Sequence, residues 1–250
     1  MKGRAGKRDC FTGVAQITGL VSGKKHFSCR QAMLVFRTLF YLKEQIHMKL
    51  CHSQSSPFVR KVKLAAHVLG FAGELELVET NTLDADDPIR SVNPLGKIPV
   101  LEDGSTILYD SRVIVEYLDA KAGGGKLIPA AGAARFETLT RAALMDGIMD
   151  AAILVVYEGR MRPEDKYVES FVTYQREKIQ RGLEVIAAFS PQYRNGAMPD
   201  AGEIALACVL DYLDFRKQLN WRDHAANLQD WLGDFAAAVP GYRETLPPDS

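Results

Sequence analysis

The chain has 250 residues, of which 47% are hydrophobic and 25% are charged, a composition typical of a globular protein with one large or two small domains. Its formal net charge is zero, and residues 48–250 carry 22 basic and 29 acidic side chains, so a nucleic-acid partner is not expected. No run approaches the roughly 18 unbroken apolar residues of a transmembrane helix, so no membrane partner is expected either.

The four cysteines are scattered along the chain. Their spacings match neither a zinc site nor a CxxC pair, so we expect no metal. Scattered cysteines in small number are typical of a reducing compartment, which favours a cytoplasmic protein. The cysteines are Cys10, Cys29, Cys51 and Cys208.

Residues 1–47 differ in composition from the rest, with nine Lys or Arg and two Asp or Glu. Charges interrupt their apolar run, so they fit a secretory signal poorly, although a basic, acid-poor leader could direct a protein to an organelle. The simpler interpretation is that Met48 is the natural start and that residues 1–47 are an upstream or dispensable extension.

From Met48 onward the elements can be predicted in order. MKLCHS (48–53) is a plausible strand, and Ser56 is expected to cap a helix whose first residue is Pro57. Apolar residues then recur at helical spacing until Gly70, which ends the helix. The alternating segment 74–79 predicts a second strand.

A polar stretch, 81–91, predicts a loop with at most one helical turn. IPVLE (98–102) predicts a strand, Asp103-Gly104 a tight hairpin turn, and STILY (105–109) the partner strand. Ser111 is expected to cap another helix, which leads to a glycine-rich linker.

After Pro129 the sequence becomes rich in Ala and Leu with a helical period. Asp200 and Glu203 form an acidic variant of the capping box at the start of one apolar segment. The predicted helices cover residues 132–160, 164–189, 200–219 and 223–238. We therefore predict an α/β domain over 48–124 followed by an all-α domain over 130–250.

The mouth of the helix at Pro57 could have a chemical role. The first N–H groups of a helix lack partners inside it and, with the helix dipole, favour an anion. Ser56 either caps only the backbone or also donates to a bound thiolate, because the pKa of a thiol, about 8.5 when free, falls at such a helix end.

Two further segments favour the second interpretation. Proline is unusual between a loop and a strand, and a cis bond would explain Ile98-Pro99. The residue before it is held extended, so its backbone can pair with a bound peptide. Asp110 and Ser111 can bind an ammonium and a carboxylate. Together these features predict a receptor for a short, charged peptide that carries a thiol.

Five stretches occur in an order and spacing that resemble the glutathione S-transferase family over residues 48–250. SPFVRK and DGIMDA resemble its bacterial members of the serine type. The resemblance implies a thioredoxin-like domain joined to a helical domain, usually in a homodimer, with glutathione as co-substrate and no other cofactor. The stretches are SSPFVRKVKLA, NPLGKIPVLED, LYDSRVIVEYLD, ALMDGIMDAAILVVYE and EIALACVLDYLDFR.

The resemblance also implies site residues. Ser56 matches the thiol-activating serine, and Ser55 is the alternative because other branches place the serine one step earlier. Ile98 matches the residue whose backbone pairs with the cysteine of glutathione, and Pro99 matches the cis-proline. The remaining matches are Asp110 and Ser111, which correspond to the pair that holds the γ-glutamyl end.

Two of these contacts are open. Many members have Glu at the position of Asp110, so the contact of the shorter side chain could be weaker or mediated by water. Lys97 could attract the glycine carboxylate of glutathione, although a loop lysine is commonly just exposed.

Other residues near the site have simpler interpretations. Cys51 is expected to pack inside the first strand, and a serine at the cap argues against disulfide exchange as the main activity. His52 could reach the mouth of the site, but a histidine at a strand end with no partner visible in the sequence is more often a packed or exposed side chain. His67 is expected to be structural. The basic residues of the first helix are interpreted as a solvated face: Arg60, Lys61 and Lys63.

In the helical domain, four residues lie on the segment that in this family walls the pocket for the second substrate. A stripe of this kind is more often plain core, so they are candidates only. They are Met145, Met149, Tyr157 and Arg160.

The function that follows is a glutathione transferase, with a role in detoxification, that directs the glutathione thiol at an apolar electrophile. The alternatives are a glutathione-binding or protein-interaction module with little catalysis, and a specialised glutathione-dependent dehalogenase, peroxidase or isomerase.

Overall fold

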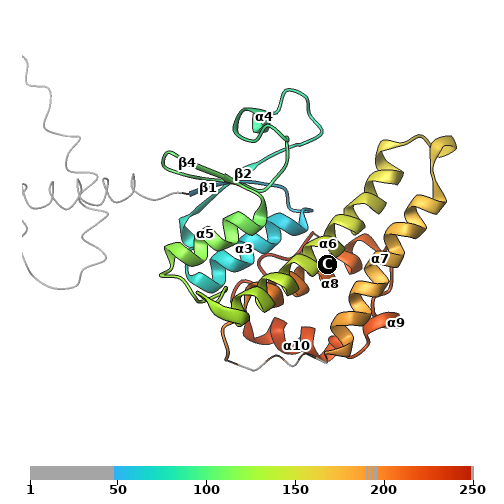
Figure 1. Cartoon of the computed structure of the whole chain (residues 1–250). Helices are drawn as coiled ribbons and strands as arrows, with labels where there is room; N and C mark the ends of the chain where they lie inside the picture. The colour runs from blue at the N-terminus through green and yellow to red at the C-terminus, as the bar shows by residue number, and fades with distance from the viewer. Residues whose placement is uncertain (1–47, 190, 192, 194–195, 249–250) are drawn as a thin grey trace, which may run out of the picture. The chain divides into compact units, whose positions relative to one another are not determined.

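The computed structural model describes residues 48–189, 191, 193 and 196–248, so the expectations for residues 1–47 lie outside the described part. An α/β part comes first in the chain and an all-helical part follows (Figure 1). The elements of the α/β part are β1 (Met48–His52), α3 (Pro57–Leu69), β2 (Leu75–Glu79), α4 (Ile89–Val92), β3 (Val100–Asp103), β4 (Thr106–Tyr109) and α5 (Ser111–Lys121).

The strands form one sheet in the order β2-β1-β3-β4, with β1 and β2 parallel and the other pairs antiparallel. Apolar residues alternate along β1, so Met48 and Leu50 are buried on the face that α3 and α5 cover. Residues Cys51 and Val100 lie on the opposite face and pack against Ile89 of α4. Figure 1 shows α3 and α5 on one side of the sheet and α4 on the other.

The predicted start and end of the first helix are confirmed. Ser56 has extended backbone angles, its hydroxyl accepts from the backbone N–H of Val59 (3.3 Å), and Pro57 is the first helical residue. Gly70 ends the helix with φ of 87°, a left-handed conformation that glycine adopts without steric cost. The prediction that Ser111 caps α5 is wrong by one residue. Asp110 is the cap, because its carboxylate accepts from the N–H of Arg112 (2.9 Å).

The all-helical part agrees with most of the predicted segments. Asp200 and Glu203 form the predicted capping box, and each side chain accepts from the other residue's backbone N–H at 2.9 Å. The fourth predicted helix is wrong as a continuous element, since it breaks before Leu228, where the amide of Asn227 donates to the carbonyl of Ala187. The helices are α6 (Gly132–Met161), α7 (Glu169–Ala188), α8 (Ala201–Arg216), α9 (Arg222–Ala225) and α10 (Leu228–Ala238).

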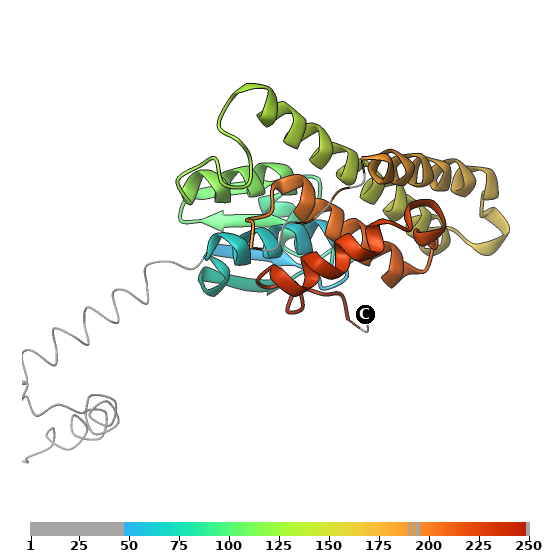
Figure 2. The ribbon, with the colours of Figure 1, turned by 90° about the horizontal axis from the view of Figure 1, so that it is seen from below.

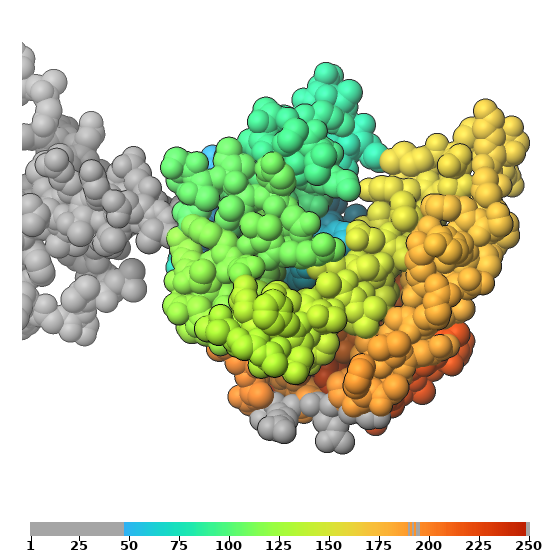
Figure 3. Space-filling view, viewed as in Figure 1, coloured from blue at the N-terminus to red at the C-terminus, as the bar shows by residue number. Residues whose placement is uncertain are grey.

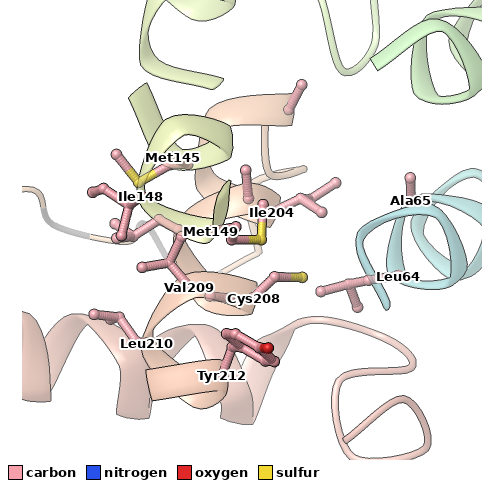
Figure 4. Close-up of a cluster of buried hydrophobic side chains, with 14 of the residues drawn as sticks. Leu64, Ala65, Met145, Ile148, Met149, Ile204, Cys208, Val209, Leu210 and Tyr212 are labelled. Atoms are coloured by element: carbon pink, nitrogen blue, oxygen red, sulfur yellow. The ribbon is translucent and has the colours of Figure 1, made fainter. Parts of the chain in front are cut away.

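One continuous core joins the two parts. Figures 1 and 2 show α8 beside α3, and Figure 4 shows side chains of α6, α8 and α3 in a common cluster. Met145 and Met149 belong to this core, where they are 2% and 0% exposed. Helix α8 is buried on nearly every side, as expected for a helix that is apolar all round.

The predicted solvated face of α3 is wrong. Arg60 and Lys61 are each only 3% exposed, and Lys63 is half-buried. The reason is that α6 and α8 cover this side of α3 and supply carboxylates. Asp211 of α8 pairs with Arg60 (Nη1 to Oδ2, 2.7 Å), and Asp146 of α6 pairs with Lys61.

Candidate functional site

Three segments singled out in the sequence leave the sheet at the same edge. Cys51 of β1 pairs with Val100 of β3, which pairs in turn with Tyr109 of β4. Ser55 and Ser56 follow β1, Ile98 and Pro99 precede β3, and Asp110 and Ser111 follow β4, so the register brings all three segments together. Figure 3 shows the surface hollowed beside this edge, with blue atoms from the start of the described chain on its floor and yellow atoms of the helical part along one wall.

The mouth of α3 retains its positive character. Ser55 and Ser56 are both half-buried, and the Oγ of Ser55 lies 3.3 Å from the Oγ of Ser53. The Oγ of Ser56 accepts from Val59, which leaves its hydrogen available to a ligand. The first turn of α3 contains no acidic residue that would neutralise the helix dipole. This end of the helix can therefore stabilise an anion such as a thiolate.

The loop before β3 is shaped by a residue that sequence reasoning missed. The bond between Ile98 and Pro99 is cis, as predicted. Asn93 is buried, donates to the carbonyl of Lys97 (2.8 Å) and accepts from the N–H of Leu95 (3.0 Å). Asn93 therefore holds both ends of the loop, and the Asn-Pro pair was the only sequence signal for it. The side chain of Lys97 is exposed.

Asp110 has an unusual backbone. Its φ is 68° and its ψ is 124°, in a region that costs a residue other than glycine about 1–3 kcal/mol. One carboxylate oxygen of Asp110 accepts from the backbone N–H of Arg112. The side chain is exposed, so its other oxygen is available to a ligand. The neighbouring Ser111 is buried. Strain of this kind is common where a fold holds a binding group in place.

A buried ionic cluster lies behind this pair and was also missed. Asp146 of α6 is 0% exposed, accepts from the Nε of Arg112 (2.8 Å) and pairs with Lys61 of α3. The hydrogen bond to Asp146 raises the pKa of Arg112. Asp146 thus connects α3, the helix that starts at Pro57, to Arg112, the residue that follows Ser111. Periodicity gave no signal for it, because only the packing of three helices brings the charges together.

One turn further along α6, Asp150 faces the same hollow. Its carboxylate lies 3.9 Å from the Nη2 of Arg112. Burial raises the pKa of Asp150, while the positive charges of Arg112 and Lys97 act in the opposite direction. This face of α6 is therefore oriented toward the predicted glutathione segments.

Other predicted residues have structural surroundings. Cys51 is buried, and desolvation raises the pKa of its thiol, so it is not a reactive thiolate. His52 is packed, one of the two expected alternatives: it is 6% exposed, and its Nε2 lies 3.0 Å from a carboxylate oxygen of Glu79. His67 packs so closely on Gly241 that a Cβ atom there would overlap its ring.

The four candidates for the second-substrate pocket separate into two groups. Met145 and Met149 are core residues that pack among buried apolar side chains (Figure 4). Tyr157 is 39% exposed, and Arg160 is also exposed. Only Tyr157 and Arg160 therefore remain available to a ligand.

Two features are absent from the described residues: a metal-binding cluster and a membrane-spanning helix. Among them, no group of three His, Cys, Asp or Glu side chains is placed to hold a metal ion. In the same part of the chain, no helix has the length and apolarity that crossing a membrane requires.

Known proteins resemble the chain in both parts. The family model "Glutathione S-transferase, N-terminal domain" matches residues 50–126, and "Glutathione S-transferase, C-terminal domain" matches residues 131–234. A curated relative, "Uncharacterized GST-like protein YibF" of Escherichia coli K12, is 34% identical over 176 residues, which are 68% of this chain and 84% of the relative.

Solved structures of glutathione transferase family members also resemble the chain. A glutathione transferase family member from Pseudomonas fluorescens Pf-5 with bound glutathione is 40% identical with a TM-score of 0.72, over 80% of this chain and 99% of that one. A structure of a family member from the same organism with bound S-(propanoic acid)-glutathione is 41% identical with a TM-score of 0.69 and the same coverage. With both of its parts matched, the chain belongs to the glutathione S-transferase family.

Proposed function

We propose that the protein is a glutathione transferase that ionises the thiol of glutathione at the start of α3 and directs it at an electrophile. The observation that carries the proposal is the convergence at one sheet edge of three segments: Ser55-Ser56, Ile98-Pro99 and Asp110-Ser111. Each suits a different part of the same tripeptide.

The sulfur would lie at the mouth of α3. The helix dipole favours the thiolate there, and the hydroxyl of Ser56 is the added hydrogen-bond donor. Ser56 acts electrostatically and is not itself modified. Ser55, half-buried beside it, is the alternative donor.

The rest of glutathione would bind along the same edge. The backbone of Ile98 pairs with the cysteine residue, in a loop that Asn93 holds in shape. Asp110 accepts from the γ-glutamyl ammonium, and Ser111 donates to its carboxylate. The exposed side chain of Lys97 would attract the glycine carboxylate.

The ionic cluster at Asp146 supports this clamp. Arg112 follows Ser111 directly, and its bond to the buried Asp146 fixes the start of α5 against α6. Because Lys61 pairs with the same carboxylate, the mouth of α3 is fixed against the same point. The cluster therefore holds the sulfur end and the γ-glutamyl end of the site in one geometry.

In the reaction, the thiolate sulfur forms a bond to an electrophilic carbon of an apolar substrate. In a displacement, the bond from that carbon to its leaving group breaks, and the leaving group takes the electron pair. The thiol proton passes to solvent. Holding both reactants adjacent supplies much of the rate gain. The ligands of the Pseudomonas structures, glutathione and an S-substituted glutathione, support this choice.

The proposal includes a cytoplasmic homodimer with a role in detoxification, a glutathione-binding domain over residues 48–124 and a helical domain over 130–250. Light scattering of the purified protein tests the dimer. Mass spectrometry of the native N-terminus tests whether residues 1–47 are an extension that the working protein lacks.

The conjugation test uses chlorodinitrobenzene with three variants. Ser56→Ala is expected to lower kcat/KM by about 10²-fold, the effect of removing a donor aimed at developing charge. Ser55→Ala should have a smaller effect, and Ser105→Ala, an exposed serine in the hairpin turn, none. Loss of activity in Ser55→Ala alone would transfer the role to Ser55. A wild type that binds glutathione but turns over no electrophile would contradict the proposal and favour a binding module.

A further inference from the structure

Two arginines and two tyrosines gather where α6 and α8 end. Tyr157 and Arg160 belong to the last turns of α6, and Tyr212 and Arg216 to the last turns of α8. Tyr212 is hydrogen-bonded to Arg216 and lies within electrostatic range of Tyr157 and Arg160. We refer to these four residues as the arginine–tyrosine cluster.

The cluster lies on the α6 side of the hollow. Asp150 faces the glutathione segments, and Tyr157 follows it by seven residues, two helical turns, so it points the same way about 10 Å further along α6. The yellow wall in Figure 3 is this part of the chain. The position is therefore beyond the predicted sulfur, where the second substrate would extend.

The end of α8 approaches the same place from the other side. Asp211 pairs with Arg60, one turn from the start of α3, and Tyr212 is the next residue of α8. The last turn of α8 therefore lies beside the mouth of α3.

The two arginines have no acidic partner among the residues that the structure describes. Eight of the twelve arginines described there form ion pairs, and Arg90 is bonded to backbone carbonyls. Arg160, Arg216 and the exposed Arg243 have neither kind of contact, and of these only Arg216 has a buried Nε without a hydrogen-bond partner. Two cations without an acidic partner, both within electrostatic range of Tyr212, attract an anion.

The geometry of Arg216 is also fixed in advance. Its guanidinium lies 4.4 Å from the ring centre of Phe215 and 5.4 Å from that of Tyr212. Contact with two rings restricts the guanidinium, and its planar fork of donors suits bidentate binding of a carboxylate. Tyr212 is 3% exposed, so it contacts Arg216 from the core side and does not itself reach a ligand.

A basic residue near a helix C-terminus can simply interact with the dipole. That role explains the charge of Arg160 and Arg216 but not their joint placement with two tyrosines or the unpartnered buried Nε. We propose that the arginine–tyrosine cluster binds an anionic group, of the carboxylate type, on the electrophile. The substrate class is then an apolar, aromatic electrophile that carries a carboxylate away from its reacting carbon. This inference rests on the proposed conjugation function.

The test is calorimetric binding of two S-substituted glutathiones, S-benzylglutathione and S-(4-carboxybenzyl)glutathione, which differ only in the carboxylate. Wild type is expected to bind the carboxylate form about tenfold more tightly, the effect of one charge-assisted contact. Arg216→Gln and Arg160→Gln should each reduce this preference to about twofold or less and leave S-benzylglutathione within about twofold of wild type.

Arg181→Gln, at an exposed position of α7, is the matched control and should keep the full preference. Arg160 is also exposed, so its variant is expected to fold even if Arg216→Gln does not. Equal wild-type affinity for the two ligands, or a preference that survives both substitutions, overturns the inference while the conjugation function stands. A wild type that binds neither ligand nor glutathione itself overturns the proposed function and this inference with it.

Discussion

Arg60 and Lys61 are neighbours on α3, and both are buried cations that pair with a carboxylate of the helical part. Their partners differ in what else they hold. Asp146, the partner of Lys61, also binds Arg112 beside Ser111. Asp211, the partner of Arg60, also accepts from the hydroxyl of Tyr242 in the C-terminal segment (2.9 Å).

The comparison separates stability from function. Both pairs fasten α3 to the helical part, and removing either carboxylate leaves a buried cation uncompensated. Only the pair at Lys61 continues to the predicted glutathione clamp. The pair at Arg60 continues instead to the C-terminal segment, where Arg60 also lies 5.0 Å from the ring centre of Tyr242.

The largest effect is expected for Asp146→Ala. It leaves the buried ammonium of Lys61 and the guanidinium of Arg112 without their shared partner, so the free energy of unfolding should fall by about 3–5 kcal/mol. The Kd for glutathione should rise at least about tenfold. Denaturant unfolding and calorimetry measure the two quantities. Asp150→Ala, one turn away and more exposed, is the control; an Asp146 variant no less stable than it would contradict the account.

Asp211→Asn should destabilise nearly as much but leave binding intact. The amide keeps an acceptor for Tyr242 and loses the charge that compensates Arg60, which should lower the free energy of unfolding by about 2–3 kcal/mol. The Kd for glutathione should stay within about twofold. Asp214→Asn, which removes a half-exposed pair with Arg222, is the matched comparison. A large loss of glutathione affinity in Asp211→Asn would remove the distinction between the two pairs.

Arg112→Gln should show the opposite pattern. Its side chain is half-exposed, so the loss of stability should be below about 1 kcal/mol. Arg112 follows Ser111 directly and anchors this part of α5 to Asp146. Its loss should therefore raise the Kd for glutathione about tenfold, or about 1.4 kcal/mol. Arg135→Gln, which removes a pair with Glu116 of α5, serves as the control. Unchanged glutathione binding would show that Asp146 does not act through Arg112.

The smallest effect concerns another buried basic group, His52. Burial lowers its pKa, and its Nδ1 has no partner, so a proton there has no acceptor. As pH falls below the unfolded value of about 6.5, the unfolded state binds the proton more strongly, and stability is lost. Thermal melting between pH 7.5 and 5.5 should show a smaller loss of Tm for His52→Gln than for wild type. An equal loss of Tm in wild type and in His52→Gln would show that His52 does not cause the loss of stability.

The sequence predicted the elements best where a local signal marked their ends. Ser56, Pro57 and Gly70 delimit α3, and Asp200 with Glu203 starts α8, because a cap is satisfied within one turn of chain. The break before Leu228 had no such signal. The cap at Asp110 was displaced by one residue because a positive φ there could not be foreseen.

The candidate site was predicted only in part, for a physical reason. Periodicity assigned Arg60 and Lys61 to solvent because it sees one helix, whereas their burial depends on carboxylates more than 80 residues away in the chain. Asp146 lay inside a stretch quoted for its family resemblance, yet nothing local marked it as an ionic partner. The roles of Ser56, Ile98 and Asp110 stay predictions.

The most direct measurement is the pKa of the thiol of bound glutathione, followed by the ultraviolet absorbance of the thiolate. The account predicts ionisation at least about one pH unit below the free value of about 8.5 in wild type and in Ser105→Ala, and a return toward that value in Ser56→Ala. A thiol that titrates at its free value in the wild-type complex would contradict it.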